Sequence, residues 1–583
     1  MARLLLLVAF ALLTGCESFP HTAYVMLAVV RPLSPTYLRY RVASPRRAWT
    51  REVVLDRDRF TELRTTGGRT YALGLADGRA WMQVGARPPV EIDGPLAADE
   101  RTEAAWVGLR YGAPEAGATS ELETCHADVC TVVYTPPDGH VLWVDVDRGT
   151  RRPTALAWVA QHDAVESCDE LRWDERDGAT VVASARCSAI VDEVGRETTT
   201  WTLEERQSEP APPAWAQVQG DDILPLRPLR EPVVFPIDDP SSRVIVFAAA
   251  AGGAALPLVL DTGSPVTILS RRFLDALGVV PAPEPPMHAR PPFLPPDTYD
   301  AAIVDRLVLG DLELHGVRVL VPRREATFEG DEAGLLGMDL LSRFVVDVDG
   351  PARTLRVGPR DRFVPDDSMV ALPFWGASHG RVVVAGAVDE LGEVPLIVDT
   401  GAPVNVLVGG PAMHARHPRR AGDDVRLGEG GGAYDYAADI EGFHLGPFGF
   451  PSMPAMGHDR RPDLSFLDDD SALVGLGVLR HFRMIVDAAQ EVVYLVPGAS
   501  YAVLTTRGLE LEDRGGAATV ARVVEGEHEW KQPVRVGDVV RGVGGRAVRG
   551  RDEALEALAE AQGPVRVALE RRGNRLVRTL GAR

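Results

Sequence analysis

The chain has 583 residues, too many for a single hydrophobic core, and its length predicts about three to five domains. Hydrophobic residues make up 45% of the chain and charged residues 25%, which is ordinary for globular protein. The net charge of −21 at pH 7 argues against a nucleic-acid partner, because such a partner requires a basic face.

The N-terminus predicts an export signal. The apolar run at 4–13 is too short to span a bilayer and is typical of a signal-peptide core. The sequence Leu-Thr-Gly-Cys at 13–16 resembles the bacterial lipobox, in which the cysteine is diacylated and becomes the new N-terminus. The resemblance implies removal of 1–15, a lipid on Cys16 that holds the protein to a membrane, and a place in the bacterial cell envelope. Glu17 favours the outer membrane, and an ordinary secretory peptide is the alternative.

Residues 16–207 are predicted to form a β-rich domain. Short alternating runs are separated by turn dipeptides such as Asp77-Gly78 and Asp138-Gly139. We expect a curved antiparallel sheet, loosely similar to bacterial lipoprotein-carrier domains. We find no catalytic constellation in this region.

Four cysteines lie in this domain: Cys125, Cys130, Cys168 and Cys187. Their even number and the export signal predict two disulfides. Sequence order favours Cys125–Cys130 and Cys168–Cys187, although three pairings are possible. A zinc site that uses His126 is the rival interpretation, but the Cys-x4-Cys spacing is poor for zinc, and we expect no metal site.

A proline-rich stretch at 208–235 predicts a stiff linker. Two versions of one unit follow, at 236–358 and 369–497. The first contains Pro-Leu-Val-Leu-Asp-Thr-Gly-Ser-Pro-Val at 257–266, and the second contains Pro-Leu-Ile-Val-Asp-Thr-Gly-Ala-Pro-Val at 395–404. The same offset of 138 residues relates Leu-Leu-Gly at 335–337 to Leu-Val-Gly at 473–475. A register that holds over this span indicates an internal duplication.

Asp-Thr-Gly after a hydrophobic strand, followed later by two hydrophobic residues and a glycine, resembles the aspartic proteases of the pepsin and retropepsin type. The resemblance implies a mainly β fold with two retropepsin-like double-psi β-barrel lobes. It also implies that Asp261 and Asp399 are the catalytic dyad of an aspartic-type endopeptidase. Two carboxyl groups that share one proton can activate water and protonate the scissile carbonyl, so no metal or other cofactor is needed.

The same resemblance assigns supporting roles. Thr262 and Thr400 are expected to make reciprocal hydrogen bonds between the lobes, while Gly263 and Gly401 line the floor of the cleft. These four residues flank the two aspartates in the Asp-Thr-Gly motifs.

Ser264 matches a position whose hydroxyl often hydrogen-bonds the neighbouring aspartate, whereas Ala402 cannot do this. Fewer hydrogen bonds to the ionised form predict activity toward weakly acidic or near-neutral pH. Tyr299 and Tyr434 are candidates for a flap tyrosine, and the alternative is that each is partly buried hairpin surface.

Residues 504–583 resemble a bacterial PDZ domain. Val-Gly-Asp-Val-Val at 536–540 is followed by a turn, a helix-like segment at 552–561 and a strand at 565–569. PDZ domains add a peptide strand to a sheet edge and hold a C-terminal carboxylate, so a C-terminal peptide is the implied ligand. The small-residue segment usual before Gly-Asp is replaced by Glu-His-Glu-Trp-Lys-Gln at 527–532. A small β-rich domain without a ligand is the alternative.

Together these features predict an exported, lipid-anchored aspartic endopeptidase that acts on protein or peptide substrates. One alternative pairs each lobe with its equivalent in a second molecule, but a linked lobe has a far higher effective concentration. Another is a non-catalytic envelope scaffold that binds peptides.

Overall fold

The computed structural model describes residues 35–44, 48–56, 59–66, 69–107, 117–159, 165–176, 179–191, 194–195, 198–208, 213–226, 229–237, 244–250, 256–277, 279, 287–289, 297–323, 332–375, 380–388, 391–409, 425–426, 433–434, 436–458, 472–524 and 534–581. The predicted signal peptide and Cys16 lie outside these residues. In the described part, no helix combines the length and the apolar character needed to cross a membrane.

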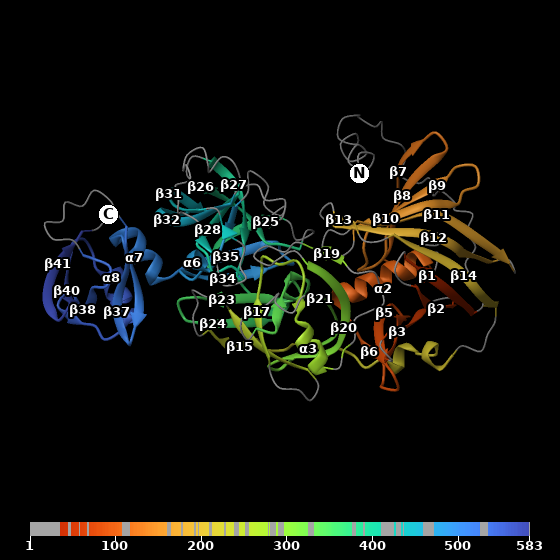
Figure 1. The fold of residues 1–583 in the computed structure, drawn as a ribbon, viewed down its shortest axis with the longest axis horizontal. Helices are drawn as coiled ribbons and strands as arrows, with labels where there is room; N and C mark the ends of the chain where they lie inside the picture. Colours follow the sequence, from red (N-terminus) through yellow and green to blue (C-terminus); the bar gives the residue numbers. More distant parts are fainter. Residues whose placement is uncertain are drawn as a thin grey trace.

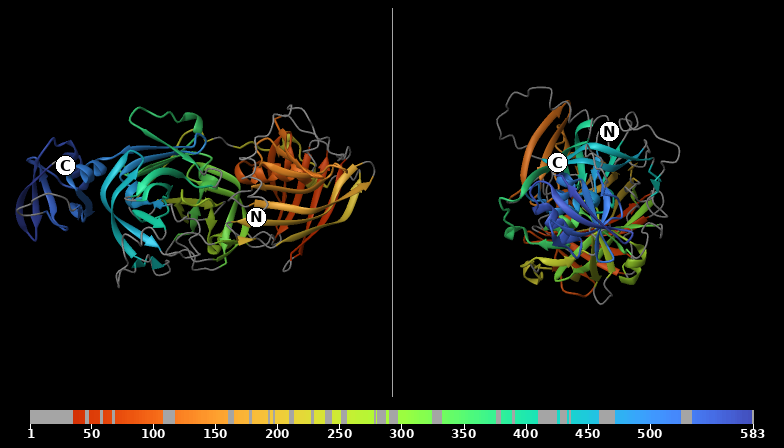
Figure 2. Two further views of the ribbon diagram at one scale, coloured as in Figure 1. Left: turned by 90° about the horizontal axis from the view of Figure 1, so that it is seen from above. Right: turned by 90° about the vertical axis from the view of Figure 1, so that its left-hand side faces the viewer.

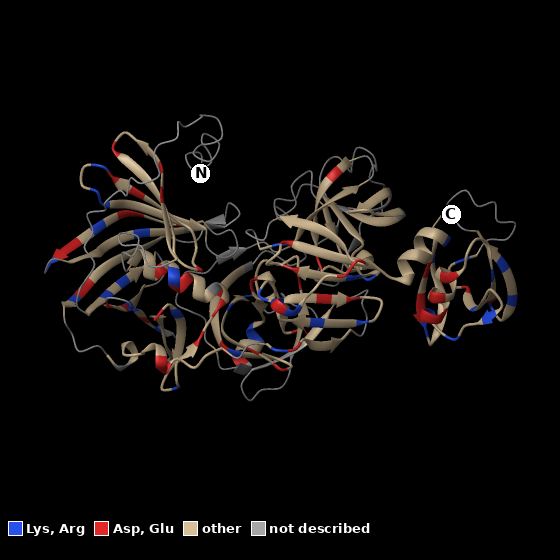
Figure 3. Cartoon of the chain, turned by 180° about the vertical axis from the view of Figure 1, so that it is seen from behind, with Lys and Arg blue, Asp and Glu red and all other residues tan. Residues whose placement is uncertain are grey.

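The chain is mainly β, as predicted, and its parts follow one another along one long axis (Figures 1 and 2). An N-terminal sheet lies at one end, two further sheets that contain the duplicated motifs lie in the middle, and a small C-terminal sheet lies at the other end. Acidic and basic residues are interspersed along this axis (Figure 3).

The N-terminal part forms one 14-stranded antiparallel sheet that curves around helix α2 (Gly94–Val107) (Figure 1). Every second residue of β9 is buried, which is the period-two pattern expected of a strand with one face on the core. Trp106 of α2 is buried and packs against Trp158 and Trp201 of the sheet. The strands are β1 (Thr36–Ala43), β2 (Ala48–Asp56), β3 (Arg59–Thr66), β4 (Arg69–Ala76), β5 (Arg79–Val84), β6 (Val90–Glu91), β7 (Thr119–His126), β8 (Val129–Thr135), β9 (Leu142–Asp147), β10 (Pro153–Val159), β11 (Val165–Arg176), β12 (Ala179–Val191), β13 (Val194–Gly195) and β14 (Thr199–Ser208).

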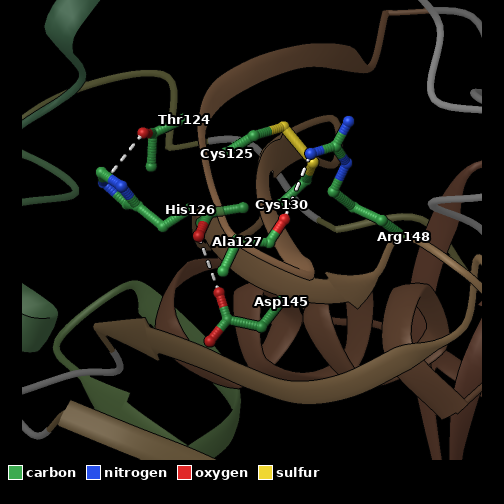
Figure 4. Close-up of a disulfide and its surroundings, with 8 residues drawn as sticks. Thr124, Cys125, His126, Ala127, Cys130, Asp145 and Arg148 are labelled. Atoms are coloured by element: carbon green, nitrogen blue, oxygen red, sulfur yellow. Dashed lines mark hydrogen bonds between the residues drawn. A yellow bond between two sulfur atoms is a disulfide. The ribbon is translucent and has the colours of Figure 1, made fainter.

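Two disulfides join neighbouring strands of this sheet. Cys125–Cys130 links β7 to β8, and Cys168–Cys187 links β11 to β12, so the predicted pairing is confirmed. The zinc alternative is wrong for these cysteines because their sulfur atoms are bonded to each other. The His126 ring lies instead 3.3 Å from the Thr124 hydroxyl (Figure 4).

The proline-rich stretch differs from the stiff linker predicted for 208–235. It contains two short 3-10 helices, η3 (Ala214–Ala216) and η4 (Gly220–Asp222), and the buried Val218 and Ile223 pack against Trp81 of the N-terminal sheet. Apolar residues between the prolines therefore fold back onto the preceding sheet. The end of the stretch, β15 (Val233–Pro236), pairs with β24 (Thr354–Gly358) in the next sheet.

Two sheets build the duplicated region, which we divide into lobe 1 (236–358) and lobe 2 (369–497). The 12-stranded sheet contains, in spatial order, β15, β24, β23 (Val345–Asp349), β34 (Phe482–Asp487), β35 (Val492–Pro497), β25 (Val370–Trp375), β26 (Val383–Val388), β27 (Gly392–Val398), β33 (Ala472–Val474), β28 (Val406–Gly409), β32 (Phe448–His458) and β31 (Tyr436–Leu445). The 7-stranded sheet contains β16 (Ile245–Ala250), β17 (Leu256–Leu260), β22 (Gly334–Leu336), β18 (Ile268–Leu269), β21 (Leu312–Pro322), β20 (Asp297–Leu309) and β19 (Met287–Ala289).

Shorter elements complete the lobes. They are α3 (Arg271–Leu277), α4 (Met338–Leu341), η6 (Arg360–Arg362), α6 (Leu476–Leu479), and the paired strands β29 (Val425–Arg426) and β30 (Ala433–Tyr434).

The lobes are joined by a strand that pairs with its own duplicate. Val345 of β23 lies opposite Asp487 of β34, and Asp349 lies opposite Arg483. Asp487 and Arg483 are the counterparts of Asp349 and Val345 at the offset of 138, so the two strands meet about a local twofold axis. Arg483 also donates from lobe 2 to both carboxylate oxygens of Asp347, at 3.0 and 2.8 Å.

Helix α2 also connects the N-terminal sheet to lobe 1. Arg318 of β21 donates to Asp99 of α2 at 2.6 Å, and Ile303 of β20 belongs to the hydrophobic core under the N-terminal sheet. A Cβ on Gly316 would lie 2.8 Å from Ile92, so the two parts are in close contact here. The N-terminal part therefore contacts lobe 1 on the side formed by β20 and β21.

The C-terminal part is a 6-stranded sheet with helix α8 (Arg551–Glu560) packed on it, preceded by helix α7 (Ala499–Arg507). Residues 527–532 lie outside the described part of this sheet. Its strands are β36 (Leu509–Arg514), β37 (Ala517–Val523), β38 (Val539–Val543), β39 (Arg546–Ala547), β40 (Val565–Arg571) and β41 (Asn574–Leu580).

Candidate active site

Each Asp-Thr-Gly follows a buried strand that is supported by the later motif of the same lobe. β17 pairs in parallel with β22, and β27 pairs in parallel with β33. The Asp261 N–H donates to the Leu336 carbonyl and the Asp399 N–H to the Val474 carbonyl, both at 3.0 Å. The Leu-Leu-Gly and Leu-Val-Gly segments thus fix where the two aspartates leave their strands.

The two aspartates meet across the lobes. A Cβ on Gly263 would lie 2.4 Å from Cγ of Asp399, and a Cβ on Gly401 would lie 2.5 Å from Cγ of Asp261. The side chains of Asp261 and Asp399 are hydrogen-bonded to each other. Only glycine leaves room for the opposing carboxyl group at these two positions.

Backbone amides hold one oxygen of each carboxyl group. The N–H groups of Gly263 and Ser264 donate to Oδ1 of Asp261, at 2.9 and 3.0 Å. In lobe 2, Gly401 and Ala402 donate in the same way to Oδ1 of Asp399, at 2.7 and 3.0 Å. The duplicated turn therefore gives both carboxyl groups the same backbone setting.

The hydroxyl of Ser264 does not serve Asp261 as predicted. It donates instead to the Val266 carbonyl at 2.8 Å, because the turn folds the short side chain back onto its own loop. The difference predicted between Ser264 and Ala402 is therefore absent at the carboxyl groups.

The two threonines make the expected reciprocal contacts. The Thr262 hydroxyl donates to the Val398 carbonyl at 2.7 Å and accepts from the Thr400 N–H at 3.1 Å. The Thr400 hydroxyl donates to the Leu260 carbonyl at 2.7 Å and accepts from the Thr262 N–H at 3.1 Å. Both side chains are fully buried, so these four bonds tie the two loops together away from water.

Burial and mutual repulsion set the proton affinity of the pair. Burial, followed by the negative charge of Asp261, raises the pKa of Asp399 well above its ordinary value. Burial also raises the pKa of Asp261, while its hydrogen bond with Asp399, the backbone amides and the charge of Arg381 act in the opposite direction. The pair thus favours a single shared proton.

Two further polar residues, Thr267 and Asp339, stabilise the loop of Asp261, and the sequence analysis did not identify them. Thr267 donates to Asp339 through its N–H at 2.9 Å and through its hydroxyl at 2.6 Å. Burial raises the pKa of Asp339 to about 6. Lobe 2 has Asn405 and Gly477 at the matching positions, so the duplication itself carries no signal for this pair.

The flap candidates are not part of the described site. Tyr299 is fully buried at the start of β20, packed with Val259, Val266 and Leu335, so it is neither a flap residue nor partly exposed surface. Tyr434 lies on β30, and its side chain is outside the described part of the structure.

Residues 247–340 match a family model described as aspartyl protease, so lobe 1 contains an aspartyl protease-like region. A search of curated proteins found no match. An aspartic proteinase from Irpex lacteus aligns with 14% identity and a TM-score of 0.33, covering 46% of this chain and 97% of that one. A LolA superfamily protein from Nitrosomonas europaea aligns with 10% identity and a TM-score of 0.26, covering 33% of this chain and 96% of that one.

Proposed function

We propose that this protein is an aspartic endopeptidase whose two lobes form one active site within a single chain. The observation that carries the proposal is the meeting of Asp261 and Asp399, each in the space left by the glycine of the opposite lobe. The shared proton that this contact favours is the protonation state that acid–base hydrolysis of a peptide bond requires.

The proposed reaction begins with a water molecule between the carboxyl groups. Ionised Asp261 removes a proton from the water as its oxygen attacks the scissile carbonyl carbon, and protonated Asp399 donates its proton to the carbonyl oxygen. The resulting diol then collapses: the C–N bond breaks, Asp261 gives its proton to the leaving nitrogen, and a diol hydroxyl returns a proton to Asp399. The pair ends in its starting state, so no cofactor is consumed.

Pairing within one chain is favoured over pairing between molecules. The twofold contact of β23 with β34 and the threonine bonds are both made between lobe 1 and lobe 2 of the same chain. A linker between the two lobes raises their effective concentration far above that of separate molecules.

The remaining parts of the proposal concern location and accessory roles. We propose that the lobes are double-psi barrels, that the protein is exported and anchored by a lipid on Cys16, and that residues 504–583 form a PDZ-like unit for C-terminal peptides. Two disulfides support an oxidising compartment such as the bacterial envelope.

The test is cleavage of a decapeptide library by the full chain in detergent, from about pH 3 to pH 8. Parent protein is compared with Asp261→Asn, Asp399→Asn and Asp311→Asn, the last being the same change at an exposed turn between β20 and β21. We expect cleavage by the parent and by Asp311→Asn, and loss of cleavage in each dyad variant. Because burial raises both pKa values, activity should reach weakly acidic or near-neutral pH.

Two results would overturn the proposal. A folded parent that cleaves nothing over the whole pH range would favour a peptide-binding scaffold. Cleavage that survives Asp399→Asn would move the chemistry to a different site.

A further inference from the structure

Helix α7 is buried on two sides. Leu504, 1% exposed, belongs to the hydrophobic core of the lobes, and the ring of Tyr501 packs 5.2 Å from Phe482. The hydroxyl of Tyr501 also donates to the Gly449 carbonyl at 3.1 Å. On another side Val503, fully buried, belongs to the core of the C-terminal sheet. This short helix is therefore part of both units.

On the C-terminal unit, α7 lies against strand β36. It also lies against helix α8 (Figure 1). Gly508, in the left-handed conformation with φ 64°, joins the end of α7 directly to the start of β36. Arg507, 4% exposed, donates to the Gly563 carbonyl at 2.7 Å and to the Ala561 carbonyl just beyond the end of α8. The end of α7 is thus fastened to both elements.

The surface between β36 and α8 is the one that a peptide would use in the PDZ mode. β36 is an edge strand of the described sheet, next to β37, and a peptide strand adds to such an edge while its side chains pack on the neighbouring helix. The Leu511 carbonyl of β36 already accepts a hydrogen bond from Arg551 of α8 at 3.0 Å. The Gly508 N–H, at the start of the strand, donates to the Leu504 carbonyl of α7 at 3.0 Å.

We infer that α7 is the resident occupant of the surface between β36 and α8, and that an external C-terminal peptide binds there only when α7 leaves. The inference rests on the proposal that residues 504–583 are PDZ-like, and it is independent of whether the dyad cleaves peptides.

Departure of α7 from this surface would also change the contact between the C-terminal unit and lobe 2. Arg480 at the end of α6 forms an ion pair with Glu510 of β36, which Arg522 of β37 also contacts at 3.0 Å. The His481 ring lies 2.9 Å from the hydroxyl of Ser500 in α7. A peptide that displaces α7 therefore loosens the C-terminal unit from the lobe that carries Asp399.

The experiment measures binding of fluorescein-labelled decapeptides with free C-terminal carboxylates to the full chain by fluorescence anisotropy. All proteins carry Asp399→Asn, so cleavage of the probe does not interfere. Val503→Asp places a charge on the side of α7 buried in the C-terminal core, and Thr506→Asp places the same charge on its exposed side. Arg507→Gln removes the bonds to the carbonyls beyond α8 as a milder release.

We expect only weak binding by the parent and by Thr506→Asp. Val503→Asp and Arg507→Gln should bind free-acid peptides at least about tenfold more tightly than the parent, a change of about 1.4 kcal/mol. Amidated peptides should not bind, because the backbone amides recognise a carboxylate. Compared with the parent, Val503→Asp and Arg507→Gln should show faster hydrogen exchange in 499–507 and unchanged protection of β40.

Equal binding by the parent and by the two release variants, Val503→Asp and Arg507→Gln, would overturn the inference. So would a lack of binding by release variants whose exchange shows α7 free and β40 protected. If Val503→Asp abolishes the protection of β40, the C-terminal core has unfolded, and the result with Arg507→Gln decides.

Discussion

Replacing Thr400 by valine tests whether the threonine contacts hold the two aspartate loops together. Valine keeps the shape of threonine but loses the bond to the Leu260 carbonyl at 2.7 Å and the bond from the Thr262 N–H at 3.1 Å. Because all of these groups are buried, each lost bond leaves an unsatisfied partner that costs about 1–3 kcal/mol. We expect a total loss of about 2–6 kcal/mol in the local stability of the loops.

Thr400→Ser is the matched control. It keeps both hydrogen bonds and removes one methyl group, which costs about 1 kcal/mol. The two variants thus separate the contribution of the hydroxyl from that of packing.

Hydrogen exchange followed by mass spectrometry measures this difference directly. A peptide spanning 256–264 contains the Thr262 N–H that loses its acceptor, and a peptide spanning 345–349 reports on β23, away from the loops. In Thr400→Val the first peptide should exchange about 30- to 20,000-fold faster, since each 1.4 kcal/mol is a factor of ten. Equal exchange of this peptide in Thr400→Val and Thr400→Ser would refute the role given to the hydroxyl.

Three further predictions concern the dyad and the N-terminal junction. Asp399→Asn should raise the melting temperature at about pH 7.5. Folding raises the pKa of Asp399 well above its ordinary value of 3.8, so this carboxyl group stabilises the folded protein below pH 3.8 and the stabilisation is lost as the pH rises. A higher melting temperature of the variant at about pH 3 would contradict this. Gly263→Ala should abolish cleavage and lower the melting temperature, since its Cβ would lie 2.4 Å from Cγ of Asp399, whereas Gly550→Ala, with open space around it, should do neither. Arg318→Met should destabilise the N-terminal part by about 1–3 kcal/mol in urea unfolding, by leaving Asp99 buried without its cation. Arg318 and the hydrogen bond from His140 outweigh burial and lower the pKa of Asp99, so this loss should shrink as pH falls through the acidic range.

The sequence patterns and the resemblance to aspartic proteases were enough to predict the mainly β fold and the residues that meet at the dyad, and sequence order favoured the disulfide pairs that form. Asp-Thr-Gly can be recognised from neighbouring residues, because each motif places its aspartate on a tight turn directly after a hydrophobic strand. The constant offset between the two motifs then predicted that Asp261 and Asp399 are equivalent, and the structure brings the two together.

Tertiary packing alone decided the other outcomes. Tyr299 is buried at the start of β20, and Asp339 pairs with Thr267, 72 residues away in the chain. A short hydroxyl, a phenol or a carboxylate takes the partner that folding brings nearest, and that partner can lie dozens of residues away. Helix α7 is the largest example: its apolar residues are divided between two cores, and only the packed chain shows that Val503 belongs to one and Leu504 to the other.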